Sequence, residues 1–187
     1  RLLGANWCGF DVSVIDLGSS IEIDRVDVGR HPRGIAVSPD SSTAYVAVMG
    51  SRDIAVIDID ALDLDYIRDV GANPRHIVIS PDGRWLYVSL NGEGRLAKLD
   101  ISTGDVVARV ATGAAPRSMD ISDDGTALYV VNYNSNTISK VRTDDMFELD
   151  ELPTNANPIG ITYDSATREV WVSNYSGTIQ VFTDVAP

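Results

Sequence analysis

The sequence has 187 residues, of which 44% are hydrophobic, and it carries a formal net charge of −12 at pH 7. A chain of this length and composition can bury a core of its own, but its acidity repels phosphate backbones and excludes nucleic acid as an expected partner. No apolar run reaches the roughly 18 residues that a membrane-spanning helix needs, and Cys8 is the single cysteine, so an internal disulfide is excluded.

Residues of one kind recur along the chain at a constant interval of 42 positions. The recurring prolines are Pro32, Pro74, Pro116 and Pro158, and the recurring aromatic residues are Tyr45, Tyr87, Tyr129 and Trp171. A fixed period indicates one structural unit per repeat. We therefore predict a single β-propeller region over residues 1–187, with a partial repeat at 1–29, full repeats at 30–71, 72–113 and 114–155, and a partial repeat at 156–187.

Each full repeat contains four short runs rich in Val, Ile and Tyr. In residues 30–71 they read GIAVS, AYVAVM, DIAVIDI and LDYIRDV, which are too short for helices and are typical of strands. Turn residues such as Pro81-Asp82-Gly83 separate the first two strands of a repeat, because Pro fixes φ, Asp bonds nearby backbone and Gly accepts a positive φ. Each repeat is therefore predicted to be a four-stranded antiparallel sheet.

The strand pattern also predicts how the sheets are packed. Several runs are apolar at consecutive positions, which indicates that both faces of each sheet are covered. Such sheets at intervals of about 40 to 50 residues are typical of propeller blades. The predicted fold class is therefore all-β, a β-propeller of four-stranded antiparallel blades, with strands in sets of three, four, four, four and three.

The second strands carry a recognisable phrase. Residues 45–48, 87–90, 129–132 and 171–174 read YVAV, YVSL, YVVN and WVSN, which resembles the YVTN family of β-propeller repeats. The resemblance implies that the chain is part of a larger ring of six or seven blades, with a self-contained ring of five as the alternative. It also implies an extracytoplasmic location (periplasmic, secreted or cell-surface) and a non-catalytic scaffold that binds a protein or a cell-surface component through its loop face.

A second group of residues points to the mouth of the central channel. Arg33, Arg75 and Arg117 each follow a recurring Pro, and the strand after that Pro is the innermost one in similar propellers. Three guanidinium groups around one axis would attract a small anionic ligand. The alternative is that each Arg pairs with an Asp of the neighbouring blade, and Ile159 replaces Arg in the fourth copy.

His76 departs from the repeat, since the matching positions are Gly34, Ser118 and Gly160. The phrase PRHIVIS, with the later NY pairs, is similar to phosphogluconolactonase-type propellers, in which His and Arg at the channel mouth serve lactone chemistry. This resemblance implies the alternative function, a lactonase- or lyase-type enzyme. Adjacent residues of a strand point oppositely, so Arg75 and His76 need a bulge to face one ligand. Otherwise His76 is expected to form a hydrogen bond between blades.

The candidate residues for a ligand or a partner are Arg33, Arg75, Arg117, His76, Asn132, Tyr133, Asn174 and Tyr175. Tyr133, Tyr175 and Trp7 end second strands, where they would form an interface or pack half-buried against the next blade. The recurring aromatic residues that include Tyr45 and Trp171 are instead expected to fill the core between blades.

We expect no cofactor, no metal site and no identifiable catalytic residue. His31, His76 and Cys8 are too few and too scattered for zinc or copper. The run DIDALDLD at 58–65 lacks the Gly and the distal Glu of a calcium loop, so Asp58 is expected to bond turn amides. A third possibility, a docking platform for a redox enzyme, would require a cofactor held by the partner.

Overall fold

The computed structural model describes residues 1–184, which form 18 strands and no helix. The first sheet consists of β1 (Leu2–Asn6), β2 (Asp11–Asp16) and β3 (Ile21–Asp27). The second consists of β4 (Pro32–Val37), β5 (Thr43–Val48), β6 (Ile54–Asp58) and β7 (Leu64–Ile67). The third consists of β8 (Pro74–Ile79), β9 (Trp85–Leu90), β10 (Arg95–Asp100) and β11 (Val106–Ala111).

Two further sheets complete the described part of the chain. The fourth consists of β12 (Pro116–Ile121), β13 (Ala127–Asn132), β14 (Thr137–Arg142) and β15 (Phe147–Pro153). The fifth consists of β16 (Pro158–Asp164), β17 (Glu169–Asn174) and β18 (Thr178–Thr183). All neighbouring strands are antiparallel, and the predicted strand numbers of three, four, four, four and three are confirmed. The end of the last predicted repeat, residues 185–187, lies outside the described residues.

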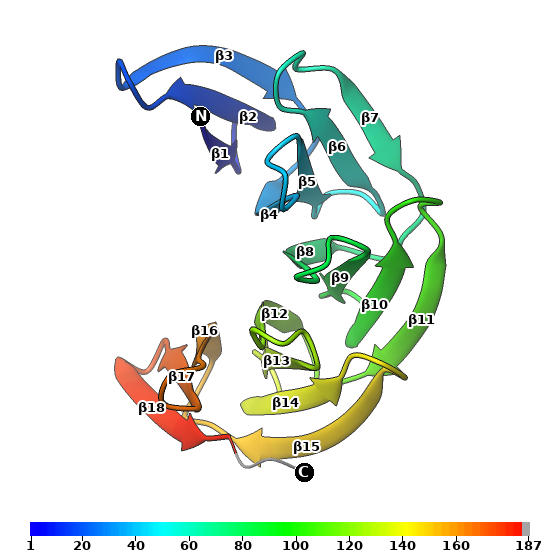
Figure 1. The fold of residues 1–187 in the computed structure, drawn as a ribbon. Helices are drawn as coiled ribbons and strands as arrows, with labels where there is room; N and C mark the ends of the chain where they lie inside the picture. Colours follow the sequence, from blue (N-terminus) through cyan, green and yellow to red (C-terminus); the bar gives the residue numbers. More distant parts are fainter. Residues whose placement is uncertain (185–187) are drawn as a thin grey trace.

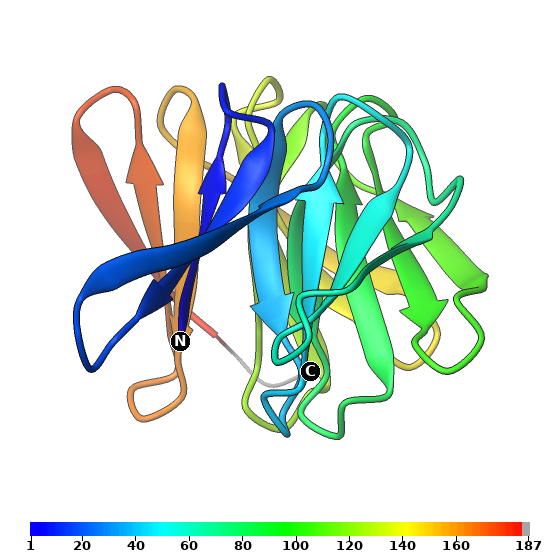
Figure 2. The same ribbon diagram turned by 90° about the horizontal axis from the view of Figure 1, so that it is seen from above.

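The five sheets stand side by side in an arc around a common axis (Figure 1). Strands β4, β8, β12 and β16, which follow the recurring prolines, lie nearest the axis, as expected for the first strand of a blade. Figure 2 shows the strands running between two layers of loops. The arc is open on one side, between the first and fifth sheets, so the described residues do not form the closed ring of five blades considered above (Figure 1).

Neighbouring sheets pack face to face, and we call each interface between two sheets a seam. The seam between the second and third sheets contains Tyr45 and Ile54 from one side and Leu86 and Leu99 from the other, all buried. Tyr87 and Tyr129 fill the next two seams, with exposed fractions of 1% and 3%. The prediction that these tyrosines fill the core between blades is confirmed, and their buried area makes the seams the main source of cohesion.

Trp171 is the exception among these aromatic residues, and the prediction that it is a core filler is wrong. It is 42% exposed, together with Ile179 and Val181 on β18. Its counterpart Tyr129 is covered by the fifth sheet, where it stacks on Tyr163 with ring centroids 4.9 Å apart. Trp171 lies in the fifth sheet itself and has no sheet beyond it in the described residues, so the same repeat position is exposed.

The tight turns form as the sequence predicts. Asp82 accepts hydrogen bonds from the Ser80 hydroxyl and from the Arg84 amide, and Gly83 takes a φ of +71°. Asp124 and Gly125, at a φ of +72°, repeat this geometry in the fourth sheet. These Asp-Gly pairs hold the first two strands of a sheet in register. No helix long and apolar enough to span a membrane occurs in residues 1–184.

Candidate functional site at the channel mouth

Each inner strand carries the same irregularity just after its proline. The pairing register shifts between Pro74 and His76 in β8, and corresponding shifts occur in β4, β12 and β16. A bulge of this kind inserts one unpaired residue and turns the side chains around it. Arg75 is the unpaired residue in β8. The condition that the sequence set for Arg75 and His76 to face one ligand is therefore met.

Four of the eight candidate residues line one cavity of about 480 Å³, which we call the mouth cavity. Its polar lining consists of Arg33, Arg75, His76, Arg117 and Ser118. Its other lining residues are Leu3, Ala5, Gly34, Ile35 and Ile159. A cavity of this size is in the range that takes small-molecule ligands.

The loops at the mouth are tied to one another by a repeated backbone bond. The amide of Met49 donates to the His31 carbonyl at 3.1 Å, and the amide of Tyr133 donates to the Ala115 carbonyl at 3.1 Å. These bonds join the link between sheets to the turn after the second strand. The two loop groups therefore lie on one face, as predicted from the antiparallel order of the strands.

The three arginines at the mouth are held without carboxylates. The Arg33 guanidinium lies 4.1 Å from the Trp7 ring centroid, and that of Arg117 lies 3.3 Å from the Tyr133 ring centroid. Arg75 donates to Met49 Sδ at 3.5 Å. None of the three forms a salt bridge within residues 1–184. The alternative that each Arg pairs with an Asp of the neighbouring blade is therefore wrong for the described residues.

Unpaired positive charge is concentrated at this point. Arg75 is only 7% exposed, and its burial, together with the nearby Arg33 and Arg117, lowers its pKa to about 10, so it stays protonated at neutral pH. Burial and the charge of Arg117 also lower the pKa of Arg33. The Nε atom of Arg117 is buried and has no hydrogen-bond partner in the described residues. Unsatisfied buried donors carry a desolvation cost that an anionic ligand would remove.

His76 connects two inner strands. Its Nδ1 accepts a hydrogen bond from the Met119 amide of β12 at 3.4 Å, and its own amide donates to Ser89 Oγ at 3.0 Å. The predicted hydrogen bond between blades is thus present. Burial lowers the pKa of His76, against an opposing effect of Asp120, so the ring is neutral at pH 7. Because Nδ1 is an acceptor, the ring proton is on Nε2.

Gly34 explains why the inner strands approach so closely at this level. A Cβ at Gly34 would lie 2.8 Å from the His76 Cα, closer than a side chain tolerates. Glycine at this position of β4 therefore leaves the room that β8 and His76 occupy.

The other candidate residues lie outside the lining of the mouth cavity. The side-chain amide of Asn132 is fully buried and donates to Ser139 Oγ at 2.8 Å. The side-chain amide of Asn174 donates to Gln180 Oε1 of β18 at 3.2 Å. Tyr133 contacts Arg117 and meets Tyr175 edge to face with ring centroids 5.9 Å apart. The two asparagines therefore support the sheets, whereas the two tyrosines border the mouth.

Sequence reasoning missed Met49 and Ser118. Met49 occupies the repeat position of Trp7 and Tyr133, so an alignment of the repeats places it beside the mouth, but its contact with Arg75 does not follow from its residue type. Ser118 lies in the cavity lining and donates to the Ile159 carbonyl at 2.7 Å.

The acidic residues that suggested calcium have structural roles. Asp58 accepts hydrogen bonds from the amides of Asp60 and Ala61 at 2.9 and 2.7 Å. No group of three or more His, Cys, Asp and Glu side chains in residues 1–184 is arranged to hold a metal ion.

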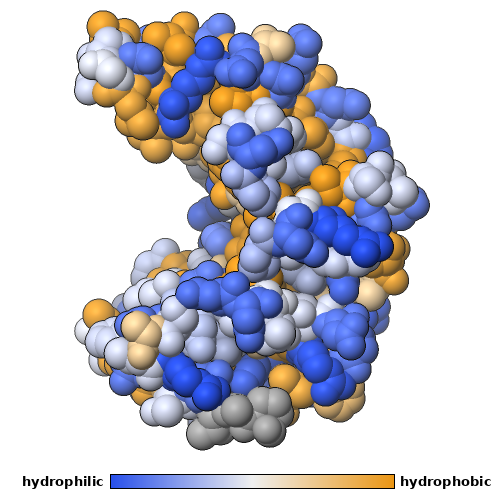
Figure 3. All heavy atoms as spheres, viewed as in Figure 1, coloured by the Kyte–Doolittle hydropathy of each residue, from blue (hydrophilic) through white to orange (hydrophobic). Residues whose placement is uncertain are grey.

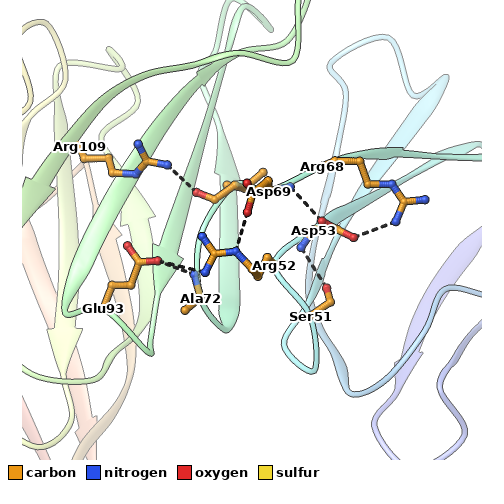
Figure 4. Close-up of polar contacts among 9 residues, drawn as sticks. Ser51, Arg52, Asp53, Arg68, Asp69, Ala72, Glu93 and Arg109 are labelled. Atoms are coloured by element: carbon orange, nitrogen blue, oxygen red, sulfur yellow. Dashed lines mark hydrogen bonds and ion pairs between the residues drawn. The ribbon is translucent and has the colours of Figure 1, made fainter.

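A second charged cluster lies on the seam between the second and third sheets and differs from the mouth (Figure 4). Here Arg52 bonds Asp69 at 2.5 Å and Arg68 bonds Asp53 at 2.8 Å, while Glu93 accepts the Ala72 amide at 2.6 Å. These positive groups are paired with carboxylates and largely exposed, so the cluster joins two sheets and offers no unpaired charge to a ligand.

Comparison with solved structures shows the same fold in other proteins. Hydrazine synthase from Kuenenia stuttgartiensis superposes with a TM-score of 0.64 at 20% identity, covering 97% of this chain and 80% of that one. Two putative 6-phosphogluconolactonases, from Bacteroides uniformis ATCC 8492 and Bacteroides fragilis NCTC 9343, each give a TM-score of 0.82 at 17% and 18% identity. This chain is covered to 97% in both, and it spans 63% and 62% of their lengths. A search of curated proteins gave no match.

The sequence itself matches a family model. The model is described as lactonase, 7-bladed β-propeller, and it matches residues 20–149, which is more than half of the chain. The matched segment includes the second and third sheets, most of the fourth, and the residues Arg33, Arg75, His76 and Arg117. The chain therefore belongs to the lactonase family of seven-bladed β-propellers.

Proposed function

We propose that the mouth cavity is the substrate site of a hydrolase that opens a lactone carrying a negative charge. The observation that supports this most directly is the convergence of three arginines on one cavity without a carboxylate partner in the described residues. Such a set neutralises an anionic substituent and orients it. Membership of the lactonase family and the phosphogluconolactonase-like neighbours agree with this function better than with a non-catalytic scaffold.

In this proposal the arginines bind the anionic group of the substrate, and His76 polarises the lactone carbonyl. Arg75 and Arg117 hold the anionic group, while the Nε2–H of His76 donates to the lactone carbonyl oxygen as negative charge develops there. Water adds to the carbonyl carbon, the ring C–O bond breaks, and the alkoxide takes up the proton that the water loses. His76 is then an electrophilic donor and not the base, since its Nδ1 already accepts the Met119 amide.

The test is a direct assay of hydrolysis. Purified protein would be incubated with lactones that carry a phosphate or carboxylate group, and acid release would be followed at constant pH. We expect turnover that falls by about 10- to 100-fold in Arg75→Leu, since hydrogen bonds to charged groups contribute about 1.5–3 kcal/mol. The matched control is Arg52→Leu in the cluster of Figure 4, which should hydrolyse at the wild-type rate. Equal rates for both variants would contradict the proposal.

A second candidate is the non-catalytic, extracytoplasmic scaffold implied by the YVTN resemblance. It is favoured by Tyr175, which is 67% exposed on the mouth loops beside Tyr133 and is available to a protein or cell-surface partner. The two functions differ in turnover. Anion binding without hydrolysis of any tested lactone would favour the scaffold, whereas hydrolysis lost in His76→Gln would favour the enzyme.

A further inference from the structure

We infer that Ser89 is a positioning residue of the mouth cavity, which fixes Arg117 of one inner strand relative to His76 of the neighbouring inner strand. This inference rests on the proposed function, in which Arg117 holds the anionic group and His76 polarises the carbonyl of the same substrate. It is carried by two hydrogen bonds of one buried hydroxyl group and by the residues that stand at the equivalent repeat positions.

The hydroxyl group of Ser89 joins two sheets. Ser89 lies on β9, is fully buried, and pairs directly with His76 of β8. Its Oγ accepts the His76 amide at 3.0 Å and donates to the Arg117 carbonyl of β12 at 2.8 Å. One side chain therefore connects the backbones of both residues across the seam between the third and fourth sheets.

The bulge in β12 explains why the Arg117 carbonyl needs a partner from another sheet. The register of β12 shifts between Pro116 and Met119, so Arg117 has no register partner on β13. A backbone carbonyl that is removed from water without a hydrogen bond is unfavourable. At the other end of the bulge, the Met119 amide donates to His76 Nδ1 at 3.4 Å. The third sheet thus holds the bulge of β12 at both ends.

The hydroxyl group of Ser89 is not needed to build a blade. The same repeat position is occupied by Ala47 in the second sheet and by Val131 in the fourth, and both are fully buried. In the fifth sheet it is occupied by Ser173, which is exposed. Because the position accepts apolar side chains inside a seam, we assign the hydroxyl to the order of the mouth and not to the cohesion of the seam.

Such positioning matters because the inner strands border the open side of the sheets. Strands β8 and β12 lie on the concave edge of the arc, where hydrophilic residues lie beside hydrophobic ones (Figure 3). Side chains at this edge lack the close packing that fixes side chains within a seam. The backbone bonds through Ser89 therefore set the separation of Arg117 and His76, and a displacement of about 1 Å in such a pair can reduce a rate on the order of 100-fold.

The experiment compares Ser89→Val with Ser89→Thr, whose side chains have nearly the same shape and differ in the hydroxyl group. Val131 at the equivalent position indicates that a β-branched side chain fits. With an anionic lactone, we expect kcat to fall by about tenfold in Ser89→Val and by less than about twofold in Ser89→Thr. The affinity for phosphate, measured by isothermal titration calorimetry, should change little in either variant, because Arg33 and Arg75 remain in the cavity.

A second pair of variants separates positioning from folding. In an Arg117→Leu background, Ser89→Val should cause no further loss of kcat, because the side chain that Ser89 positions has already been removed. The matched control is Ser173→Val, the same substitution at the equivalent, exposed position of β17, which should keep the wild-type rate. Thermal unfolding followed by circular dichroism shows that each variant folds.

The outcomes distinguish this inference from the proposed function. A wild-type rate in Ser89→Val, equal losses in Ser89→Val and Ser89→Thr, or a further loss in the Arg117→Leu background would overturn the role of Ser89 and leave the proposed function intact. If the wild type hydrolyses no anionic lactone, the proposed function is wrong, and the inference about Ser89 is wrong with it.

Discussion

The seams and the mouth of the channel use the 42-residue repeat in opposite ways. In the seams the repeat is kept, and Tyr45, Tyr87 and Tyr129 are all buried between sheets. At the mouth it is broken, since His76 stands where Gly34 and Ser118 stand in other sheets. The comparison teaches that recurring residues serve both places, the tyrosines in the seams and Arg33, Arg75 and Arg117 at the mouth, whereas departures from the repeat such as His76 make the sheets differ from one another at the mouth alone.

The largest effect is expected from breaking a seam. Tyr87→Ala should lower the free energy of unfolding by about 3–5 kcal/mol, because a large aromatic side chain is removed from a close-packed interface. Trp171→Ala, at the same repeat position but 42% exposed, should cost clearly less. Chemical denaturation of both variants measures the difference. Equal losses would mean that exposure does not distinguish the two positions, and the contrast drawn for the seams would fail.

The next effect separates binding from stability at the mouth. Arg75→Leu should weaken phosphate binding by about 10- to 100-fold while the free energy of unfolding is unchanged or raised, because a buried and unpaired charge is removed. Calorimetric titration and denaturation of the same preparation give both numbers. A variant that unfolds easily and binds normally would assign Arg75 to the fold.

A smaller effect is expected from the ionisation of His76. Burial lowers its folded pKa below the usual 6.5, so the unfolded chain takes up this proton at a higher pH than the folded chain does. The free energy of unfolding should therefore fall as the pH decreases below 6.5, and His76→Gln should reduce that slope. Asp120 opposes the shift and Arg75 supports it. Identical slopes in both proteins between pH 6.5 and the range where carboxylates titrate would contradict this.

The smallest effect is expected at the exposed charged cluster of Figure 4. Arg52→Ala removes the ion pair with Asp69, but both side chains are largely exposed and their attraction is screened by solvent. The midpoint of thermal unfolding should not change measurably. A large decrease would show that this seam depends on its charges more than on the apolar residues beneath them.

The features that recur in every repeat could be predicted from the sequence. The strands, the Asp-Gly turns and the buried tyrosines follow from local patterns that recur, so errors in one repeat are corrected by the others. Trp171 was predicted wrongly because its burial depends on a neighbouring sheet and not on its residue type. The bulge at Arg75 follows from backbone pairing across two strands, and the contact with Met49 follows from the approach of two sheets. Neither is written in the local pattern.

The bulges in the inner strands have a consequence for how such a protein changes over evolutionary time. Two of the inner strands, β8 and β12, present two consecutive side chains to the mouth cavity, Arg75 with His76 and Arg117 with Ser118. Substitution of one such pair changes the part of the mouth cavity that one sheet lines, while the residues from the other sheets stay the same. The repeated architecture thus allows specificity to change one sheet at a time, but not at Gly34, where a Cβ would lie 2.8 Å from the His76 Cα.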